Sequence, residues 1–329
     1  SVGPFDLELI TLTHSIPEPN AVVIRSPLGT VLHTGDWKFD PDPVIGDQAD
    51  QAALRALGDD GVLAMVCDST NVFSPGQSGS EGDIFENMSG IIADCPGRIA
   101  VACFATNVAR LETIARAAQE NGRQVVLAGR SLWRIQSAAR ENGYLADIPA
   151  FLDEAEANNL PDDKVLIICT GSQGEPRAAL SRIANGDHPR IELGEGDWVV
   201  FSSREIPGNE TSISRLQNDL VARGVRIITA RDAFIHVSGH PNRDELSHMY
   251  QLVRPRIAVP VHGELRHLVE HARLARECQV EAAIVAPNGT MARLAPDPVE
   301  TVDHVPTGRL AMVGGWLVPL DGNLIKERI

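Results

Sequence analysis

The sequence of 329 residues lacks the features that mark several specialised classes of protein. None of its hydrophobic runs approaches the roughly 20 apolar residues that a membrane-spanning helix needs, so we expect no membrane segment. The start of the chain also lacks the basic, apolar and small-residue pattern of a secretory signal. With 43% hydrophobic and 22% charged residues, the composition is typical of a globular protein, and the length suits about two domains.

Cysteine is scarce, and basic residues are outnumbered. An odd number of widely spaced cysteines, mostly within apolar runs, argues against a disulfide framework or a zinc knuckle and is typical of buried thiols in a reducing cytoplasm. The 44 acidic residues exceed the 29 lysines and arginines, which gives a net charge of -15. This charge disfavours a surface coated with basic groups for nucleic acid, but it does not exclude a local basic channel. The five cysteines are Cys67, Cys95, Cys103, Cys169 and Cys278.

What the sequence contains is a succession of short apolar strands and amphipathic helices. From residue 98 onwards strands and helices alternate, which predicts a parallel sheet with right-handed crossovers. Alternation of apolar and polar residues at 5–13 predicts a half-buried strand. The other expected strands are 21–25, 30–34, 61–66, 98–104, 124–128, 164–169, 198–202, 225–229, 256–262, 309–313 and 316–320, and the expected helices are 107–121, 131–142, 211–223, 242–253 and 264–278.

Polar side chains stand at the ends of several expected strands. His14, Asp36 and His262 each follow a strand directly, and Asp68 follows the buried strand 61–66. Open α/β sheets place their chemistry at the carboxyl ends of strands, so these side chains are expected to converge. Imidazole and carboxylate are the ligands of hydrolytic zinc and manganese sites. Each residue alone is more often a hydrogen-bonded strand-end side chain, so only the combination favours a metal site.

Two glycine-containing loops, 129–131 and 170–175, each follow a strand and open a helix. Free backbone N–H groups at such positions suit phosphate oxygens. A capped tight turn is the commoner role of a loop of this kind, so phosphate binding and a purely structural turn both remain open.

Eight blocks of sequence resemble the ribonuclease J family, in order through nearly the whole chain. The blocks TGSQGEP and HVSGH are specific to this branch of the metallo-β-lactamase fold. The resemblance implies an α/β fold, namely an incomplete metallo-β-lactamase αββα sandwich with an inserted β-CASP domain built on a parallel, Rossmann-like sheet. The blocks are HSIP (14–17), HTGDWKFD (33–40), CDSTN (67–71), GRS (129–131), CTGSQGEPRAALSRIANGDH (169–188), IPGNE (206–210), HVSGH (236–240) and PVHGELRHL (260–268).

The implied domains divide the chain into four segments. Residues 1–78 belong to the metallo-β-lactamase domain before the insert, 79–240 form the β-CASP domain, 241–305 return to the metallo-β-lactamase domain, and 306–329 are a linker towards a further domain.

The resemblance implies a metal-dependent ribonuclease that hydrolyses RNA phosphodiesters. We expect 5'-3' exonuclease and endonuclease activity, preference for 5'-monophosphate ends, and roles in rRNA processing and mRNA decay in the cytoplasm. Two zinc ions per full-length subunit are implied, with manganese or magnesium as alternatives. The implied partners are single-stranded 5'-monophosphorylated RNA, further copies in a homodimer or homotetramer, and proteins of an RNA-degradation complex.

The resemblance also implies a role for individual residues. In it, Asp36 bridges two metal ions and His240 donates to the scissile phosphate or the leaving oxygen. The implied metal ligands are His14, Asp36 and His262; the implied catalytic residues are Asp36, Asp68 and His240; and the implied RNA or phosphate-binding residues are Arg130, Ser131, Gly171, Ser172, His236, Ser238 and Gly239.

One departure from the family pattern affects the metal site. The family supplies further ligands from an HxHxDH motif, and none of the ten histidines here has that spacing. We therefore expect this stretch alone to bind metal weakly and to cleave poorly. The alternatives are a non-catalytic RNA-binding or assembly subunit of the same fold, a DNA-directed β-CASP nuclease, and a lactonase-type enzyme. A nucleotide-binding transferase is disfavoured because neither a GxGxxG nor a Walker loop is present.

Overall fold

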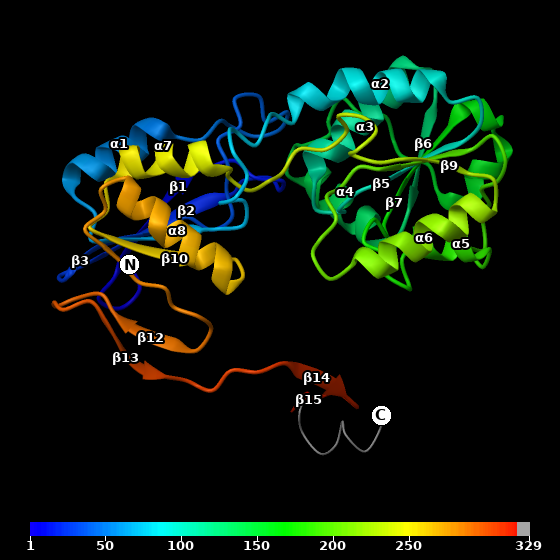
Figure 1. The fold of residues 1–329 in the computed structure, drawn as a ribbon. Helices are drawn as coiled ribbons and strands as arrows, with labels where there is room; N and C mark the ends of the chain where they lie inside the picture. The colour runs from blue at the N-terminus through cyan, green and yellow to red at the C-terminus, as the bar shows by residue number, and fades with distance from the viewer. Residues whose placement is uncertain (321–329) are drawn as a thin grey trace.

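The computed structural model describes residues 1–320, which form two lobes, each built on one sheet, followed by two small hairpins (Figure 1). The chain leaves the first lobe after its fourth strand, builds the whole second lobe, and then returns to the first. Residues 321–329, the end of the predicted linker, lie outside the described residues. The domain boundaries given above stay predictions. Within the described residues no helix is both long enough and apolar enough to cross a membrane.

The first lobe has a six-stranded sheet in the order β1-β2-β3-β4-β10-β11. The first three strands pair antiparallel, and β3, β4, β10 and β11 pair parallel. Helices α1, α7 and α8 contribute to one apolar core on the same face of this sheet. The elements are β1 (Asp6–Thr11), β2 (Asn20–Ser26), β3 (Gly29–His33), β4 (Ala64–Asp68), β10 (Ile257–Val261), β11 (Ala282–Ala283), α1 (Gln51–Asp60), α7 (Arg243–Val253) and α8 (Leu265–Glu277).

The first strand, β1, is half-buried as predicted, with one covered and one exposed face. Ile10 and Leu12 lie in the core, but Leu7 and Leu9 are 47% and 64% exposed. Successive side chains of a strand point to opposite faces, so Leu7 and Leu9 belong to the face away from the three helices. Alternation indicated the two faces correctly but could not show which of them is covered.

The inserted lobe has an all-parallel sheet in the order β6-β7-β5-β8-β9, as the strand and helix alternation predicted. Its central strands are buried on both faces, which explains their continuous apolar sequences. The elements are β5 (Ile99–Ala102), β6 (Gln124–Ala128), β7 (Val165–Cys169), β8 (Trp198–Phe201), β9 (Arg226–Ile228), α2 (Phe85–Asp94), α3 (Val108–Glu120), α4 (Arg130–Glu141), α5 (Ala179–Asn185) and α6 (Glu210–Ala222), with 3-10 turns η1 (Gly82–Ile84), η2 (Glu154–Asn159) and η3 (Asp162–Lys164).

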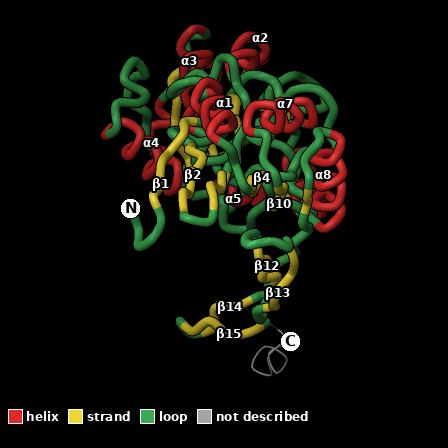
Figure 2. The backbone as a smooth tube through the Cα atoms, turned by 90° about the vertical axis from the view of Figure 1, so that its left-hand side faces the viewer, coloured by secondary structure: helices red, strands yellow, loops and turns green. Residues whose placement is uncertain are grey.

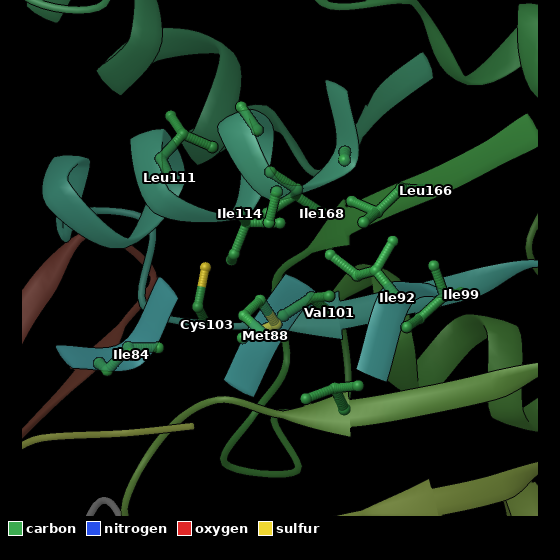
Figure 3. Close-up of a cluster of buried hydrophobic side chains, with 14 of the residues drawn as sticks. Ile84, Met88, Ile92, Ile99, Val101, Cys103, Leu111, Ile114, Leu166 and Ile168 are labelled. Carbon is green, nitrogen blue, oxygen red and sulfur yellow. The ribbon is translucent and has the colours of Figure 1, made fainter. Parts of the chain in front are cut away.

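Helices cover both faces of this second sheet. α2, α3 and α4 share one core with β5 and β7, and Figure 3 shows residues such as Met88, Ile114 and Ile168 meeting there. α5 and α6 share the core on the opposite face. The sequence did not predict α1 or α2, each of which has ten residues and a short apolar stripe. It predicted a helix after the loop 170–175, and the seven-residue α5 lies there.

A buried polar junction fixes the point where the chain leaves the first lobe. Lys38 is paired with Asp40 at 2.7 Å, and its ammonium group also donates to the carbonyl of Gly79. Asp40 in turn accepts hydrogen bonds from the Ser80 hydroxyl and from the backbone N–H of Glu81. Because all of these charges are desolvated and paired, the junction has one preferred geometry.

The described chain ends in two small hairpins that extend away from both sheets (Figures 1 and 2). They are formed by β12 (Thr290–Arg293) with β13 (Glu300–His304), and by β14 (Leu310–Val313) with β15 (Trp316–Pro319).

Candidate active site

Five side chains from separate segments meet beside the carboxyl ends of β3, β4 and β10. Nε2 of His262 lies 3.5 Å from Oδ2 of Asp36, and Nε2 of His14 lies 4.0 Å from the same oxygen. The His240 ring centre is 5.0 Å from that of His14 and 5.3 Å from that of His262. Asp68 contacts His240 directly. The structure thus brings together all the metal and catalytic candidates of the sequence analysis.

The tautomer of His14 follows from its backbone contact. Its Nδ1 lies 2.5 Å from the carbonyl oxygen of Gly239, and a carbonyl can only accept, so Nδ1 carries the proton. The lone pair is then on Nε2, which faces Asp36 and also lies 3.4 Å from the Ser15 hydroxyl. Burial lowers the pKa of His14, which keeps this nitrogen neutral. A Cβ at residue 239 would lie only 2.7 Å from the His14 ring, so the approach requires glycine.

Asp68 orients His240. Oδ2 of Asp68 lies 2.6 Å from Nδ1 of His240, while Oδ1 accepts from the backbone N–H and the hydroxyl of Thr70. Burial raises the pKa of Asp68, but these hydrogen bonds outweigh it, so the pKa falls below its ordinary value. Burial lowers the pKa of His240, but the bond to Asp68 outweighs it and the pKa rises. His240 therefore holds a proton towards Asp68 and leaves Nε2 available.

The donor set fits a zinc ion. Ligand atoms of His14, Asp36 and His240 lie within 4.8 Å of one another, as do those of Asp68, His240 and His262. Ligands of a tetrahedral zinc at about 2.0–2.1 Å are separated by roughly 3.3 Å, close to the observed distances to Asp36. Both oxygens of Asp68 and Nδ1 of His240 already have protein partners. The donors left free are therefore those of His14, Asp36 and His262, together with Nε2 of His240.

A cavity of about 490 Å³ lies beside this cluster and is bounded by both lobes. Asn71 spans its edge, since its amide donates to the Ser238 hydroxyl and to the carbonyl of His240. Arg204 donates to the oxygen of the same amide at 2.6 Å, so the cavity has a fixed cation at its wall. The lining includes Ser172, Ser203, Arg204, His236 and Ser238.

His236 enters this cavity as a neutral hydrogen-bond donor. Nη1 of the fully buried Arg110 lies 3.4 Å from Nδ1 of His236, and a guanidinium can only donate, so Nδ1 accepts and Nε2 carries the proton. Burial and the nearby Arg110 lower the pKa of His236 to about 3. Arg110 is itself held by Glu81 through two hydrogen bonds.

Comparison with known proteins identifies the family. Residues 96–220 match the family described as "Ribonuclease J, beta-CASP domain", and residues 224–285 match the "Zn-dependent metallo-hydrolase RNA specificity domain". The chain is 48% identical over 328 residues to the Ribonuclease J of Sinorhizobium meliloti, which covers 100% of this chain and 58% of that protein. The chain belongs to the ribonuclease J family.

Further relatives agree with this assignment. The chain is 38% identical to the Ribonuclease J of Corynebacterium glutamicum, covering 99% of this chain and 46% of that protein. It is also 38% identical to the Ribonuclease J of Thermus thermophilus, covering 98% and 57%. The chain thus spans roughly half the length of the curated relatives it matches.

The fold is a metallo-β-lactamase fold with an inserted β-CASP domain, as the resemblance to ribonuclease J predicted. A solved structure of a protein of unknown function from Enterococcus faecalis has a TM-score of 0.57 at 15% identity, covering 92% of this chain and 65% of that one. At that identity the likeness concerns the fold alone.

Not all the predicted phosphate-binding residues of this ribonuclease J chain share one cavity. Ser172, His236 and Ser238 line the cavity described above, whereas Arg130 and Ser131 line another one at the ends of β6 and β7. Gly171 is buried between the two, and a Cβ there would lie 2.9 Å from Ala178, so close packing requires glycine. Gly239 lies against His14, as described above.

Several residues around the site were not assigned from the sequence. Asn71 lies in the CDSTN block that marked the family. Its position therefore drew attention to it but did not indicate what it does. Arg110 lies on the buried face of α3, three residues before Thr113 and four before Ile114. A charged residue on that face was a signal that we missed. Arg204 follows β8 and lies in none of the family blocks.

Proposed function

We propose that this protein is a metal-dependent ribonuclease that hydrolyses RNA phosphodiesters. The supporting observation is the convergence of His14, Asp36 and His262 beside a cavity lined by hydroxyls, a neutral histidine donor and an arginine. The names of the relatives and of the two matched families point in the same direction.

His14, Asp36 and His262 would hold zinc, with Asp36 between the two histidines. When bound, zinc in such a site supplies a water of lowered pKa and stabilises charge on a phosphoryl oxygen. The carbonyl of Gly239 keeps the lone pair of His14 on Nε2, as a ligand requires. These three residues do not complete two four-coordinate sites, so we expect residues 1–329 alone to bind zinc weakly and to cleave poorly.

His240 would act as the proton donor to the leaving oxygen. Asp68 raises the pKa of His240 and fixes its ring, so a protonated imidazole can present Nε2 to the substrate. Asp68 itself has no free oxygen for a substrate, so we assign it the orienting role. As His240 gives up its proton, the Asp68 carboxylate stays charged beside it.

The neighbouring cavity would hold a terminal phosphate. Hydroxyls of Ser172 and Ser238, Nε2–H of His236 and the guanidinium of Arg204 offer donors that suit a 5'-monophosphate. The carboxylate of Glu205, which also lines the cavity, is paired with Arg231. Ser238 and His240 are two residues apart, so a phosphate held there lies within about one nucleotide of the cluster. We therefore propose exonucleolytic 5'-3' cleavage with a preference for 5'-monophosphate ends, together with some internal cleavage.

The biological setting follows as part of the same proposal. We propose processing of rRNA and decay of mRNA in the cytoplasm, by a homodimer or homotetramer that joins other RNA-degrading proteins. No contact among the described residues identifies the partners.

The test uses the full-length protein and matched 5'-monophosphorylated RNA and DNA strands. We expect cleavage of RNA over DNA, bound zinc by elemental analysis, and loss of both zinc and cleavage in His262→Ala. The control is His248→Ala, whose side chain bonds to Gln51 away from the cluster and should leave both properties intact. Metal-free protein that binds RNA would instead support a non-catalytic subunit, and preference for DNA would support a DNA-directed nuclease.

A further inference from the structure

A second cavity, of about 830 Å³, lies at the carboxyl edge of the β-CASP sheet beyond β6 and β7. These strands are neighbours, but the helices that follow them leave in opposite directions. α4 follows β6 and joins the core with α2 and α3, whereas α5 follows β7 and joins the core with α6. Doubly wound sheets bind ligands in the crevice that such a divergence opens.

Arginine dominates the lining of this cavity. The side chains of Arg130, Arg134 and Arg177 make no ion pair and no hydrogen bond to any residue between 1 and 320. Arg182 also lines the cavity and donates to the carbonyl of Asp187. In a chain with a net charge of -15, unpaired arginines gathered in one crevice are a marked local exception. Their fork of donors suits phosphate oxygens.

The two acidic side chains of the cavity have partners other than its arginines. Glu154 accepts from the backbone N–H of Gly129, and its other oxygen lies 3.7 Å from the imidazole of His188. Glu175 accepts from the backbone N–H of Gln173. Neither carboxylate pairs with an arginine of the lining, so the guanidinium groups stay available to an anion.

The arginine cavity and the phosphate cavity adjoin one another. Thr170 lines the first and Ser172 lines the second, and both belong to the loop after β7. Two residues of extended chain span at most about 7 Å, so one polyanion can cross this loop and occupy both cavities. A 5'-terminal phosphate held by Ser172 ends the strand there. Only RNA with nucleotides upstream of that point would reach the arginines.

We propose that Arg130, Arg134, Arg177 and Arg182 bind the phosphodiester backbone upstream of the phosphate cavity, and so serve internal rather than terminal cleavage of RNA. This inference rests on the proposed ribonuclease function and adds a subsite to it. Arg134 lies outside every block that marked the family, and Arg177 and Arg182 lie inside one block without an assigned role, so only the folded crevice shows that they line one cavity.

The test compares two RNAs in the full-length protein. A circular single-stranded RNA can be cut only internally, whereas a short 5'-monophosphorylated RNA is degraded from its end. In the triple variant Arg130→Ala/Arg134→Ala/Arg177→Ala we expect binding of the circle to weaken about tenfold or more. The slope of log affinity for the circle against log salt concentration should become shallower by roughly 2, because each lost phosphate contact on a single strand contributes about 0.7. Cleavage of the short RNA should stay within about twofold of wild type.

The control removes the same charge elsewhere, in Arg116→Ala/Arg215→Ala/Arg276→Ala, three exposed arginines outside the cavity. An equal loss in this control, or unchanged affinity for the circle in the first variant, would overturn the subsite. In a separate experiment, calorimetry measures the binding of a nucleoside monophosphate. Binding of the nucleotide that is lost in the first variant, without any change for the circle, would identify a nucleotide site instead. Absence of all RNA cleavage by wild type would overturn the proposed function itself, together with this subsite.

Discussion

The two ends of the segment from residue 236 to residue 240 hold the same side chain in opposite electrostatic surroundings. His240 pairs with the buried carboxylate of Asp68, which raises its pKa despite burial. His236 faces the buried guanidinium of Arg110, and burial together with that charge lowers its pKa to about 3. One imidazole is thus prepared to carry a proton, and the other is kept neutral.

This difference shows that the group in contact with an imidazole, and not the imidazole itself, decides whether it carries a proton. His271 extends the comparison, because its partners are uncharged. It is fully buried between the hydroxyls of Ser69 and Tyr250, and burial lowers its pKa to about 4. Only the carboxylate beside His240 therefore outweighs burial, whereas the imidazoles of His236 and His271 are kept neutral.

The largest effect should come from removing His240, the histidine prepared to carry a proton. We expect His240→Ala to slow RNA cleavage by about 10²–10⁴-fold, the usual contribution of a general acid, with RNA affinity changed only a few-fold. His236→Ala should instead raise KM for 5'-monophosphorylated RNA and leave internal cleavage nearly intact. Single-turnover kinetics on both RNAs would separate these outcomes. If both variants lost the same step, the two histidines would not have distinct roles.

Arg110→Met should have the next largest effect, on stability. Glu81 would remain buried without its partner, which costs about 3–5 kcal/mol of unfolding free energy. Adding Glu81→Leu should recover much of that loss, because a buried pair and a well-packed apolar pair are often similar in stability. Urea unfolding of both variants measures this.

The double variant also tests the orientation of His236. Since no donor would then fix Nδ1 of His236, KM for 5'-monophosphorylated RNA should stay raised even where stability is recovered. A stable double variant with wild-type KM would show that Arg110 supports the fold alone.

A smaller effect, on pH dependence, should come from His271. Its pKa is about 4 in the folded chain and near 6.5 when unfolded, so the unfolded state binds the extra proton as pH falls through this range. The stabilisation is present above pH 6.5 and is lost towards pH 4, by about 2 kcal/mol between pH 7 and pH 5. His271→Gln should reduce the fall in unfolding free energy over that interval by this amount. The exposed His304→Gln should not, and an equal slope in both would refute the assignment.

The sequence predicted the inserted sheet well for a physical reason. Strands β5, β7 and β8 are buried on both faces, so their apolar runs left little ambiguity. Strand β1 was the exception, because alternation shows two faces but not which neighbour covers them. Short helices such as α1 and α2 were missed since ten residues give too few turns for a clear stripe.

The site was predictable only where position along a strand sufficed. His14, Asp36 and His262 follow strands that share one edge of the sheet, so their convergence follows from topology. The partners that tune the histidines are far away in sequence. Arg110 lies 126 residues from His236, and Asp68 lies 172 residues from His240, so no local pattern predicts these contacts.

The smallest expected effect concerns the start of helix α7, which follows the segment 236–240 and supports its C-terminal end. Asn242 caps α7 two residues after His240, and Asn242 and Glu245 form a reciprocal capping box. Asn242→Ala should cost about 1 kcal/mol of unfolding free energy, because a backbone donor of the first turn loses its acceptor. Asn242→Asp keeps that acceptor but loses the amide that donates to the carbonyls of Pro75 and Gln77, so it should cost a similar amount. The orientation of His240 depends chiefly on Asp68, so the cleavage rate of either variant should stay within about threefold of wild type. A far larger loss of rate in Asn242→Ala at unchanged stability would show that the helix start, and not the carboxylate, positions the proton donor.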